Sequence, residues 1–210
     1  MPRYYPMMLD VKGRKCVVVG GGEVAARKVE TLLDCGALVT VLAPRLEPEL
    51  ADMVAGRKIT HLNREYSKGG LDGSALAIAA TDDENVNRSV YNDAVESRIP
   101  VNVVDVPELC TFIVPSIVER GDLLIAISTS GKSPAMAKRI RRELEEKFGA
   151  EYGVVLELMG EMRLLLQKRE PDLGKRMQIL SAIANSNLLE RVRGGERPGA
   201  DETLREFGLK

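Results

Sequence analysis

The chain has 210 residues, of which 44% are hydrophobic and 29% charged, and its formal net charge is −1. It is long and apolar enough to bury a core, whereas its charge balance argues against general affinity for nucleic acid or anionic lipid. Its apolar runs fall short of the roughly 20 residues that a membrane span needs, and its first residues lack the apolar core of a signal peptide. We therefore expect a cytoplasmic protein that binds neither membrane nor nucleic acid.

The three cysteines, Cys16, Cys35 and Cys110, are odd in number and widely spaced. This spacing fits neither a disulfide framework nor a CxxC metal or redox pair, so we expect buried, reduced thiols. The single histidine, His61, is expected to be an ordinary surface residue rather than a ligand. The sequence therefore predicts no metal site.

The first half of the chain alternates short apolar strands with helices. Residues 15–19 (KCVVV) read as a buried strand, three glycines follow, and residues 23–35 carry apolar side chains at helical spacing. Four further strands and one helix are expected, the strands at 38–42, 59–62, 75–80 and 101–104 and the helix at 84–97. This alternation predicts an α/β fold, a Rossmann-type parallel sheet with right-handed crossovers.

The second half begins with a different pattern. Residues 112–119 and 123–128 read as two strands joined by a turn at Arg120-Gly121-Asp122. Helices are then expected at 134–148, 151–168 and 172–190, with a short final helix after a Gly/Pro/charge-rich segment. No helix is predicted to cover the paired strands, so their open edge should pair across a two-fold axis in a homodimer.

The glycine-rich turn fits the pattern GxGxxA, from Gly20 to Ala25, between a buried strand and an amphipathic helix. Gly20 permits the tight turn, Gly22 lets the backbone approach a pyrophosphate, and Ala25 allows close packing of helix and strand. The free N–H groups of the helix N-terminus then face the phosphates. The motif predicts a dinucleotide-binding site.

The end of the second strand lacks the acidic residue that usually binds the ribose about 20 residues beyond such a turn. Ala43-Pro44-Arg45 stands there instead. Arg45 is either a partner for a 2′-phosphate or a solvated loop residue, so these residues leave the choice between NAD and NADP open.

Two further strand ends carry polar residues. Thr81 and Glu84 fit a capping box for the helix at 84–97, and the backbone at Thr81 is expected to border the cofactor. Asp105 follows Asn102-Val103-Val104, where side chains converge on the nicotinamide end of a dinucleotide. It is equally compatible with a simple turn before Val106-Pro107.

The loop at 128–133 consists of small residues and leads into a basic helix. It fits either an anion-binding helix start or a simple helix cap. The basic side chains between residues 132 and 147 are Lys132, Lys138, Arg139, Arg141, Arg142 and Lys147.

Several separated segments resemble the N-terminal part of siroheme synthases and the stand-alone precorrin-2 dehydrogenases. These segments, in chain order and together spanning roughly residues 4–146, are YPMMLDVKGRKCVVVGGGEVAARKVETLL, GALVTVLAP, AIAATDDENVN, IPVNVVDVPELCTFIVPSIVERGDL and ISTSGKSPAMAKRIRREL. The resemblance implies oxidation of precorrin-2 to sirohydrochlorin with NAD, in a homodimer formed by the central segment.

The resemblance also implies roles for individual residues. Asp105 corresponds to the family's essential aspartate, and the cofactor contacts correspond to backbone at Glu23, Val24, Pro44 and Arg45. The substrate carries eight carboxylates, for which Lys132, Lys138, Arg139 and Arg142 are candidate partners, a solvated helix face being the alternative for each. The expected substrate-binding residues are Asn102, Thr129, Ser130 and Lys132. Thr129 stands where some members have a serine that is modified or touches the tetrapyrrole.

We accordingly expect three regions, an NAD-binding Rossmann domain at 1–111, a dimerisation region at 112–150 and a helical C-terminal region at 151–210. Two alternatives to the simple dehydrogenase remain. One is a bifunctional enzyme that also inserts iron into sirohydrochlorin. The other is a regulatory module that senses a dinucleotide without catalysing a reaction. Such a module would not explain the NVVD strand end or the basic helix.

Overall fold

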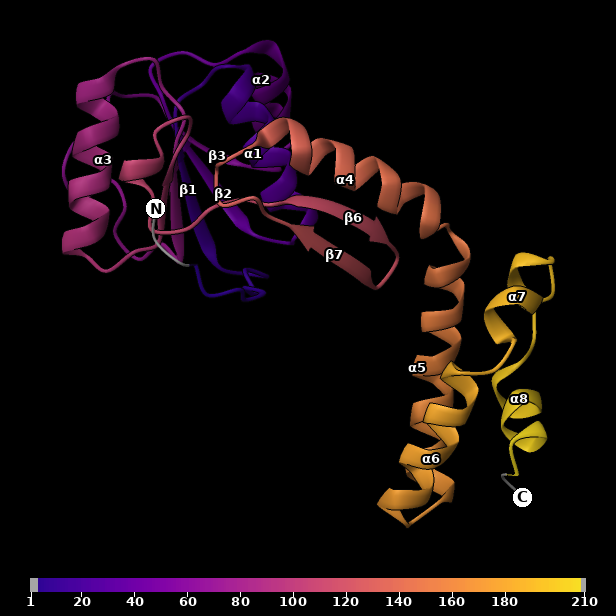
Figure 1. Ribbon diagram of the computed structural model, residues 1–210. Helices are drawn as coiled ribbons and strands as arrows, with labels where there is room; N and C mark the ends of the chain where they lie inside the picture. The colour runs from indigo at the N-terminus through magenta and orange to yellow at the C-terminus, as the bar shows by residue number, and fades with distance from the viewer. Residues whose placement is uncertain (1–3, 209–210) are drawn as a thin grey trace. The chain divides into compact units, whose positions relative to one another are not determined.

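The computed structural model describes residues 4–208, and the chain divides into two compact units, Met1–Val114 and Pro115–Lys210. The first unit is built on a five-stranded parallel sheet of order β3-β2-β1-β4-β5 (Figure 1). Its strands are β1 (Lys15–Val19), β2 (Leu38–Leu42), β3 (Thr60–Leu62), β4 (Leu76–Ala79) and β5 (Val101–Val103). The strand order reverses between β1 and β4, which confirms the predicted Rossmann-type α/β fold.

Helices cover both faces of this sheet because side chains alternate along each strand. Cys16 and Val18 of β1 face α1 (Glu23–Asp34), whereas Val17 and Val19 face α3 (Glu84–Glu96). All four of these side chains are buried. The β1 strand therefore lies inside two apolar layers, and its carboxyl end is held rigidly.

Two local expectations for the first unit are wrong. An additional helix, α2 (Pro48–Ala55), follows β2. It packs on the core through Leu50, Met53 and Val54, whose i, i+3, i+4 spacing extends over only one turn and is therefore a weak signal in sequence. The capping box of Thr81 and Glu84 does not form. Instead Asp83 is the N-cap of α3, and its carboxylate accepts hydrogen bonds from the N–H groups of Asn85 and Val86.

The second unit begins with the antiparallel pair β6 (Ser116–Arg120) and β7 (Leu123–Ile127), joined at Gly121. The first strand begins four residues later than expected, because Pro115 has no N–H with which to extend the ladder. Helix α4 (Pro134–Lys147) packs on one face of the pair, against Val118 and Ile127. The expectation that no helix covers these strands is thus wrong for this face.

The C-terminal helices are α5 (Glu151–Arg169), α6 (Leu173–Ala184), α7 (Leu188–Arg193) and α8 (Ala200–Glu206). Leu158, Met162 and Leu166 lie four residues apart on α5 and form a core with the other three helices. The single helix expected at 172–190 is divided into α6 and α7. Ser186 causes the break, since its hydroxyl donates to the Ile183 carbonyl and accepts from the Leu188 N–H.

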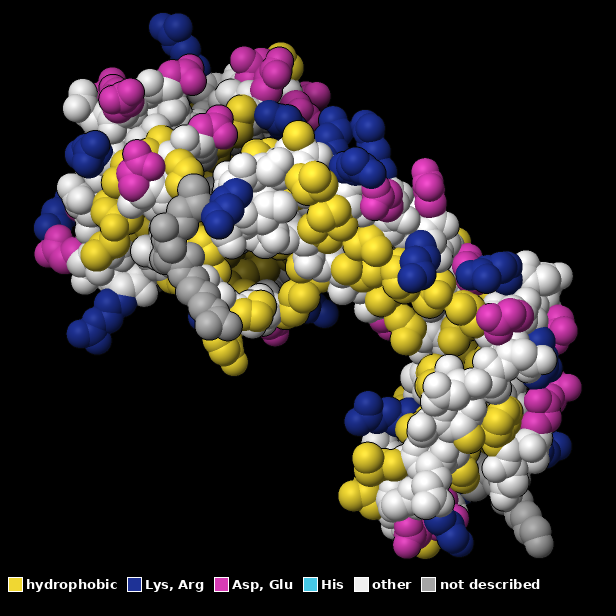
Figure 2. All heavy atoms as spheres, in the orientation of Figure 1, with side chains coloured by type: hydrophobic (Ala, Val, Ile, Leu, Met, Phe, Trp, Pro, Cys, Tyr) yellow, Lys and Arg dark blue, Asp and Glu magenta, His cyan; other side chains and the backbone are white. Residues whose placement is uncertain are grey.

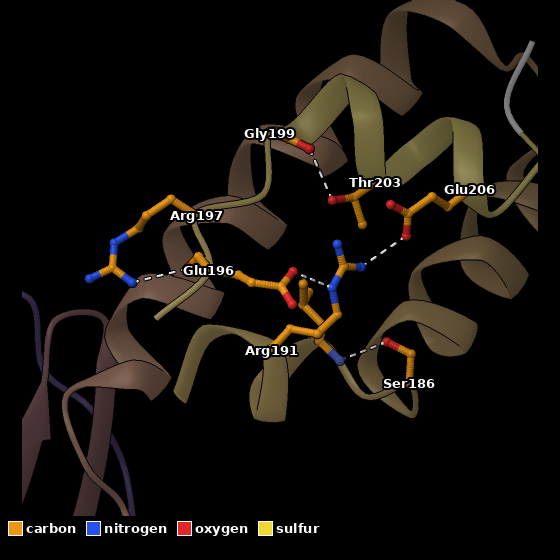
Figure 3. A network of polar contacts seen from close by, with 8 residues as sticks. Ser186, Arg191, Glu196, Arg197, Gly199, Thr203 and Glu206 are labelled. Carbon is orange, nitrogen blue, oxygen red and sulfur yellow. Dashed lines mark hydrogen bonds and ion pairs between the residues drawn. The ribbon is translucent and has the colours of Figure 1, made fainter. Parts of the chain in front are cut away.

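Arg191 of α7 binds two carboxylates, Glu196 in the segment that follows α7 and Glu206 at the end of α8 (Figure 3). Its guanidinium donates to Glu196 at 2.8 Å and to Glu206 at 2.9 Å, with the side chain only 24% exposed. Both carboxylates raise the pKa of Arg191. This partly buried arrangement ties together two short helices that would be marginal alone.

The cysteines differ in their surroundings. Cys16 is buried and Cys110 half-buried, but Cys35 is exposed, against expectation, because it caps the C-terminal end of α1 on the solvent side. His61 of β3 is half-buried, with Nε2 2.8 Å from the carbonyl oxygen of Ala43. Across the described residues, each helix is too short or too polar to span a bilayer.

Candidate active site

The glycine turn after β1 lies at the point where the strand order of the sheet reverses. Gly20 has φ +125°, and a Cβ there would lie 2.1 Å from the carbonyl oxygen of Ala80. At Gly21 a Cβ would lie 1.9 Å from the carbonyl oxygen of Arg45. The turn is therefore packed against the backbone that follows β4 on one side and β2 on the other, which requires glycine at both positions.

The middle glycine thus has a role that the GxGxxA pattern does not assign. Gly21→Ala is expected to destabilise the protein by about 1–3 kcal/mol, as overpacking does, because the backbone at Arg45 must move away from the new methyl group. Urea unfolding measures this change. Gly22→Ser is the matched control, since a Cβ at Gly22 meets no atom within 4 Å and serine is a favoured N-cap residue; equal midpoints for the two variants would contradict the assignment.

Gly22 is the N-cap of α1 and carries no side chain to satisfy the first turn. The first intrahelical bond runs from the Ala26 N–H to the Gly22 carbonyl, so the N–H groups of Glu23, Val24 and Ala25 have no partner within the helix. Open space lies beside Gly22. An anionic group such as a pyrophosphate fits this helix start, and the residues present therefore suit a dinucleotide.

The other cofactor-site candidates gather at the same edge of the sheet. Pro44 and Arg45 are exposed and follow β2, with Arg45 backbone against Gly21. Thr81 follows β4, and its methyl group lies 3.4 Å from the position of a Cβ on Gly20. The Thr81 hydroxyl also bonds to Asn87 Oδ1 at 3.0 Å, so its side chain holds the loop in place.

Asp105 follows β5 on an exposed turn and has φ +61°. Aspartate and asparagine tolerate this left-handed conformation better than most residues. Asp105 lines a cavity of about 310 Å³ together with residues of α1. The lining residues are Val24, Arg27, Lys28, Thr31, Val104 and Asp105. The end of β5, which carries Asp105, and helix α1, which begins at the glycine turn, therefore line the same cavity.

Cys110 holds the turn that carries Asp105. Its thiol can donate to the carbonyl oxygens of Val103 at 3.2 Å and Val106 at 3.3 Å, and its sulfur accepts from the Val103 N–H. Burial raises the pKa of this thiol, so it remains a donor. Asn102 Nδ2 bonds to the same sulfur and, at 3.0 Å, to the Phe112 carbonyl; its amide nitrogen thus has a structural use.

The sequence predicts no role at this site for Cys110 or for the basic residues of the cavity, Arg27 and Lys28. A half-buried cysteine leaves no spacing signal. The α1 residues do have a signal in the sequence, because positions 24, 27, 28 and 31 follow the i, i+3, i+4, i+7 spacing of a single helix face.

The loop at 128–133 lies in the second unit. Ser133 caps α4 by accepting from the Met136 N–H, and Thr129 Oγ1 pairs with the Ser133 backbone. Ser130 has φ +53° and Lys132 is exposed. The capping role expected for this loop is thus observed, and its anion-binding role stays a prediction.

Lys and Arg side chains gather along α4 (Figure 2). Arg139 and Arg141 are paired with Glu143 and Glu145 one turn further on. Within the part of the chain that the structure describes, three or more potential metal-ligating side chains do not come together.

Two known protein families match separate parts of the chain. Residues 7–116 match the family described as "Putative NAD(P)-binding". Residues 120–147 match the family described as "Sirohaem biosynthesis protein central". The first match covers the glycine turn and Asp105, and it identifies the cofactor as a nicotinamide dinucleotide.

Curated relatives include the siroheme synthases of Methylobacillus flagellatus, 41% identical, and Thioalkalivibrio sulfidiphilus, 42% identical, each over 201 residues and 96% of this chain. The chain spans only 43% and 41% of the length of these two relatives. Among solved structures, SirC, a precorrin-2 dehydrogenase, superposes with a TM-score of 0.80 and 27% identity, covering 97% of this chain and 98% of SirC. The chain therefore belongs to this NAD(P)-binding family and is a homologue of the siroheme synthases.

Proposed function

We propose that this chain oxidises precorrin-2 to sirohydrochlorin with NAD, as a cytoplasmic enzyme of siroheme biosynthesis. The observation that carries the proposal is the cavity that Asp105 shares with Val24. Val24 belongs to the first turn of α1, whose free N–H groups suit a pyrophosphate. On this proposal the Asp105 carboxylate would be the base beside the dinucleotide site. The likeness to SirC along nearly the whole chain supports the same activity.

The dinucleotide would be held mainly by backbone. The N–H groups of Glu23 and Val24 would receive its pyrophosphate, with the exposed Pro44 and Arg45 on one side and Thr81 on the other. When bound there, NAD supplies the acceptor for the hydride. The choice of NAD over NADP is part of the proposal and follows from the family resemblance.

Asp105 would take the proton. Oxidation of precorrin-2 removes two electrons and two protons, one proton leaving with the electron pair as hydride and the other going to a base. The exposed carboxylate of Asp105 can accept that second proton and pass it to solvent. Cys110, through its bonds to Val103 and Val106, keeps the turn in the conformation that presents Asp105 to the cavity.

Anaerobic incubation of the chain with enzymatically made precorrin-2 and either NAD or NADP tests the function. The proposal expects the absorbance spectrum of sirohydrochlorin to appear with NAD. An unchanged precorrin-2 spectrum with both dinucleotides would refute it.

Three residues of the second unit are the proposed contacts for the substrate carboxylates, the half-buried Thr129 and Ser130 and the exposed Lys132. Lys132 is exposed, and Thr129 and Ser130 lie beside it on the loop that leads into α4. Their hydroxyl and ammonium groups are suitable donors to carboxylates. Asn102, whose nitrogen is bonded to the Phe112 carbonyl, would contact the substrate through Oδ1, which accepts from an N–H group and does not bond to a carboxylate.

A homodimer formed by residues 112–150 is also proposed. Helix α4 covers one face of the β6–β7 pair, but the other face exposes Ile117 at 38% and Leu124 at 41%. These two residues belong to the cross-strand pairs Ile117 with Ala126 and Leu124 with Glu119, which are separated by the pair Val118 with Ile125 and therefore lie on the same face. A second copy can cover this face and the free strand edges at once.

The double variant Ile117→Glu/Leu124→Glu is expected to sediment as a monomer of 23.0 kDa, while the parent sediments as a dimer at micromolar concentration. The two carboxylates would have to be buried unpaired in the dimer, which is strongly unfavourable. Leu164→Glu on α5 is the control, since Leu164 is 59% exposed and lies outside 112–150. A monomeric parent would contradict the proposed dimer.

A further inference from the structure

One face of α1 lines the cavity beside Asp105. Val24, Arg27, Lys28 and Thr31 lie on that face, and Val104 and Asp105 line the cavity from the end of β5. These elements belong to the same compact unit. The cavity is about 310 Å³ in volume, which is enough for a carboxylate side chain of a ligand but not for a whole tetrapyrrole.

The cavity has an excess of positive charge. Among residues 4–208, the side-chain nitrogens of Arg27 and Lys28 have no carboxylate oxygen within 4.0 Å, although Asp105 lines the same cavity. Lys28 is half-buried. By contrast, Arg139 and Arg141 on α4 are both paired. Two cations held beside a cavity without a protein partner are suited to an anionic ligand.

We propose that Arg27 and Lys28 bind a carboxylate side chain of the substrate and so orient precorrin-2 over Asp105. This inference rests on the proposed function, because it takes the polycarboxylate tetrapyrrole as the ligand. Arg27 supplies a planar fork for a carboxylate and Lys28 a point charge. A substrate anchored at these two cations has its ring beside the acid that accepts the proton.

The phosphates of the dinucleotide are a less suitable ligand for these cations. The pyrophosphate belongs at the first turn of α1, at Glu23 and Val24. Thr31, at the far end of the cavity lining, is about 10 Å further along the helix axis than Val24, at about 1.5 Å per residue. Arg27 and Lys28 thus lie one turn beyond the phosphate-binding N–H groups, on the side of the helix that faces Asp105.

The test is the double variant Arg27→Gln/Lys28→Gln, measured for KM, kcat and NAD affinity. We expect the KM for precorrin-2 to rise by about 10- to 100-fold, the usual effect of losing charge-assisted hydrogen bonds, with kcat within about threefold of the parent. Affinity for sirohydrochlorin, measured by fluorescence without cofactor, should fall by a similar factor. NAD affinity by calorimetry should stay unchanged.

Two control variants accompany this measurement. Lys58→Gln/Arg98→Gln removes the same charges from exposed positions that precede β3 and β5 at the opposite edge of the sheet, and its KM should equal that of the parent. The swap Arg27→Lys/Lys28→Arg keeps both charges and should retain most of the affinity. Circular dichroism checks that each variant is folded.

Each failure has a distinct signature. A parent that does not oxidise precorrin-2 overturns the proposed function, and this inference with it. A parent that turns over, with an unchanged KM in Arg27→Gln/Lys28→Gln, overturns the carboxylate site alone. A loss of NAD affinity with an unchanged KM for precorrin-2 would assign the two cations to the dinucleotide and likewise overturn the inference.

Discussion

Asp105→Asn is expected to lower turnover of precorrin-2 by about 10²–10⁴, the usual contribution of a general base. Asparagine matches aspartate in size and tolerates the left-handed φ of +61° at this position, so the turn after β5 should keep its shape. Asparagine cannot accept the proton that is lost with the hydride. Steady-state kinetics should therefore show a lower kcat, while calorimetry should show the NAD affinity of the parent.

The control for this change is Glu108→Gln, which removes an exposed acid three residues further on, within the short helix η1 (Pro107–Leu109). Its turnover should match that of the parent. If Asp105 only forms a turn, asparagine should serve nearly as well. Rates for Asp105→Asn within about threefold of the parent would remove Asp105 from the mechanism.

Gly22→Asp is expected to weaken NAD binding by about 10²–10³-fold. Like charges about 4 Å apart repel by about 4 kcal/mol at an effective dielectric constant of about 20, and the new carboxylate would face the pyrophosphate. The fold should tolerate the change, because a Cβ at Gly22 meets open space. Aspartate is also a favoured N-cap residue, so α1 should be at least as stable as in the parent.

Gly22→Asn separates charge from size in this experiment. Asparagine is nearly isosteric with aspartate and caps helices equally well, but it carries no charge. It should therefore weaken NAD binding less than aspartate does. A folded Gly22→Asp protein with the NAD affinity of the parent would show that the dinucleotide does not lie against this turn.

The sheet could be predicted from sequence because its signals are local. Each buried strand, such as 15–19 with its run of three valines, is a short apolar segment bounded by glycine or proline. Helix α2 was missed because it is only eight residues long and its apolar spacing, Leu50, Met53 and Val54, extends over a single turn. The break between α6 and α7 was missed because it depends on hydrogen bonds of Ser186 rather than on apolar spacing.

The candidate site could be predicted only in part. The glycine turn and Asp105 follow strands, so their meeting at one edge of the sheet follows from parallel topology. The close approach of Gly21 to Arg45 depends on the path of the backbone after β2. The cavity of Arg27 and Lys28 depends on how α1 packs beside β5, which is a contact between segments far apart in sequence. Such contacts have no local signature.

The stoichiometry of a single turnover tests the central claim most directly. The chain is mixed anaerobically with a known amount of precorrin-2 and an excess of NAD, and both products are measured by absorbance. The proposed function predicts one NADH and one sirohydrochlorin for each precorrin-2 consumed, with both products appearing at the same rate. Binding of NAD without formation of either product would contradict it and would leave a dinucleotide-sensing module as the better description of this chain.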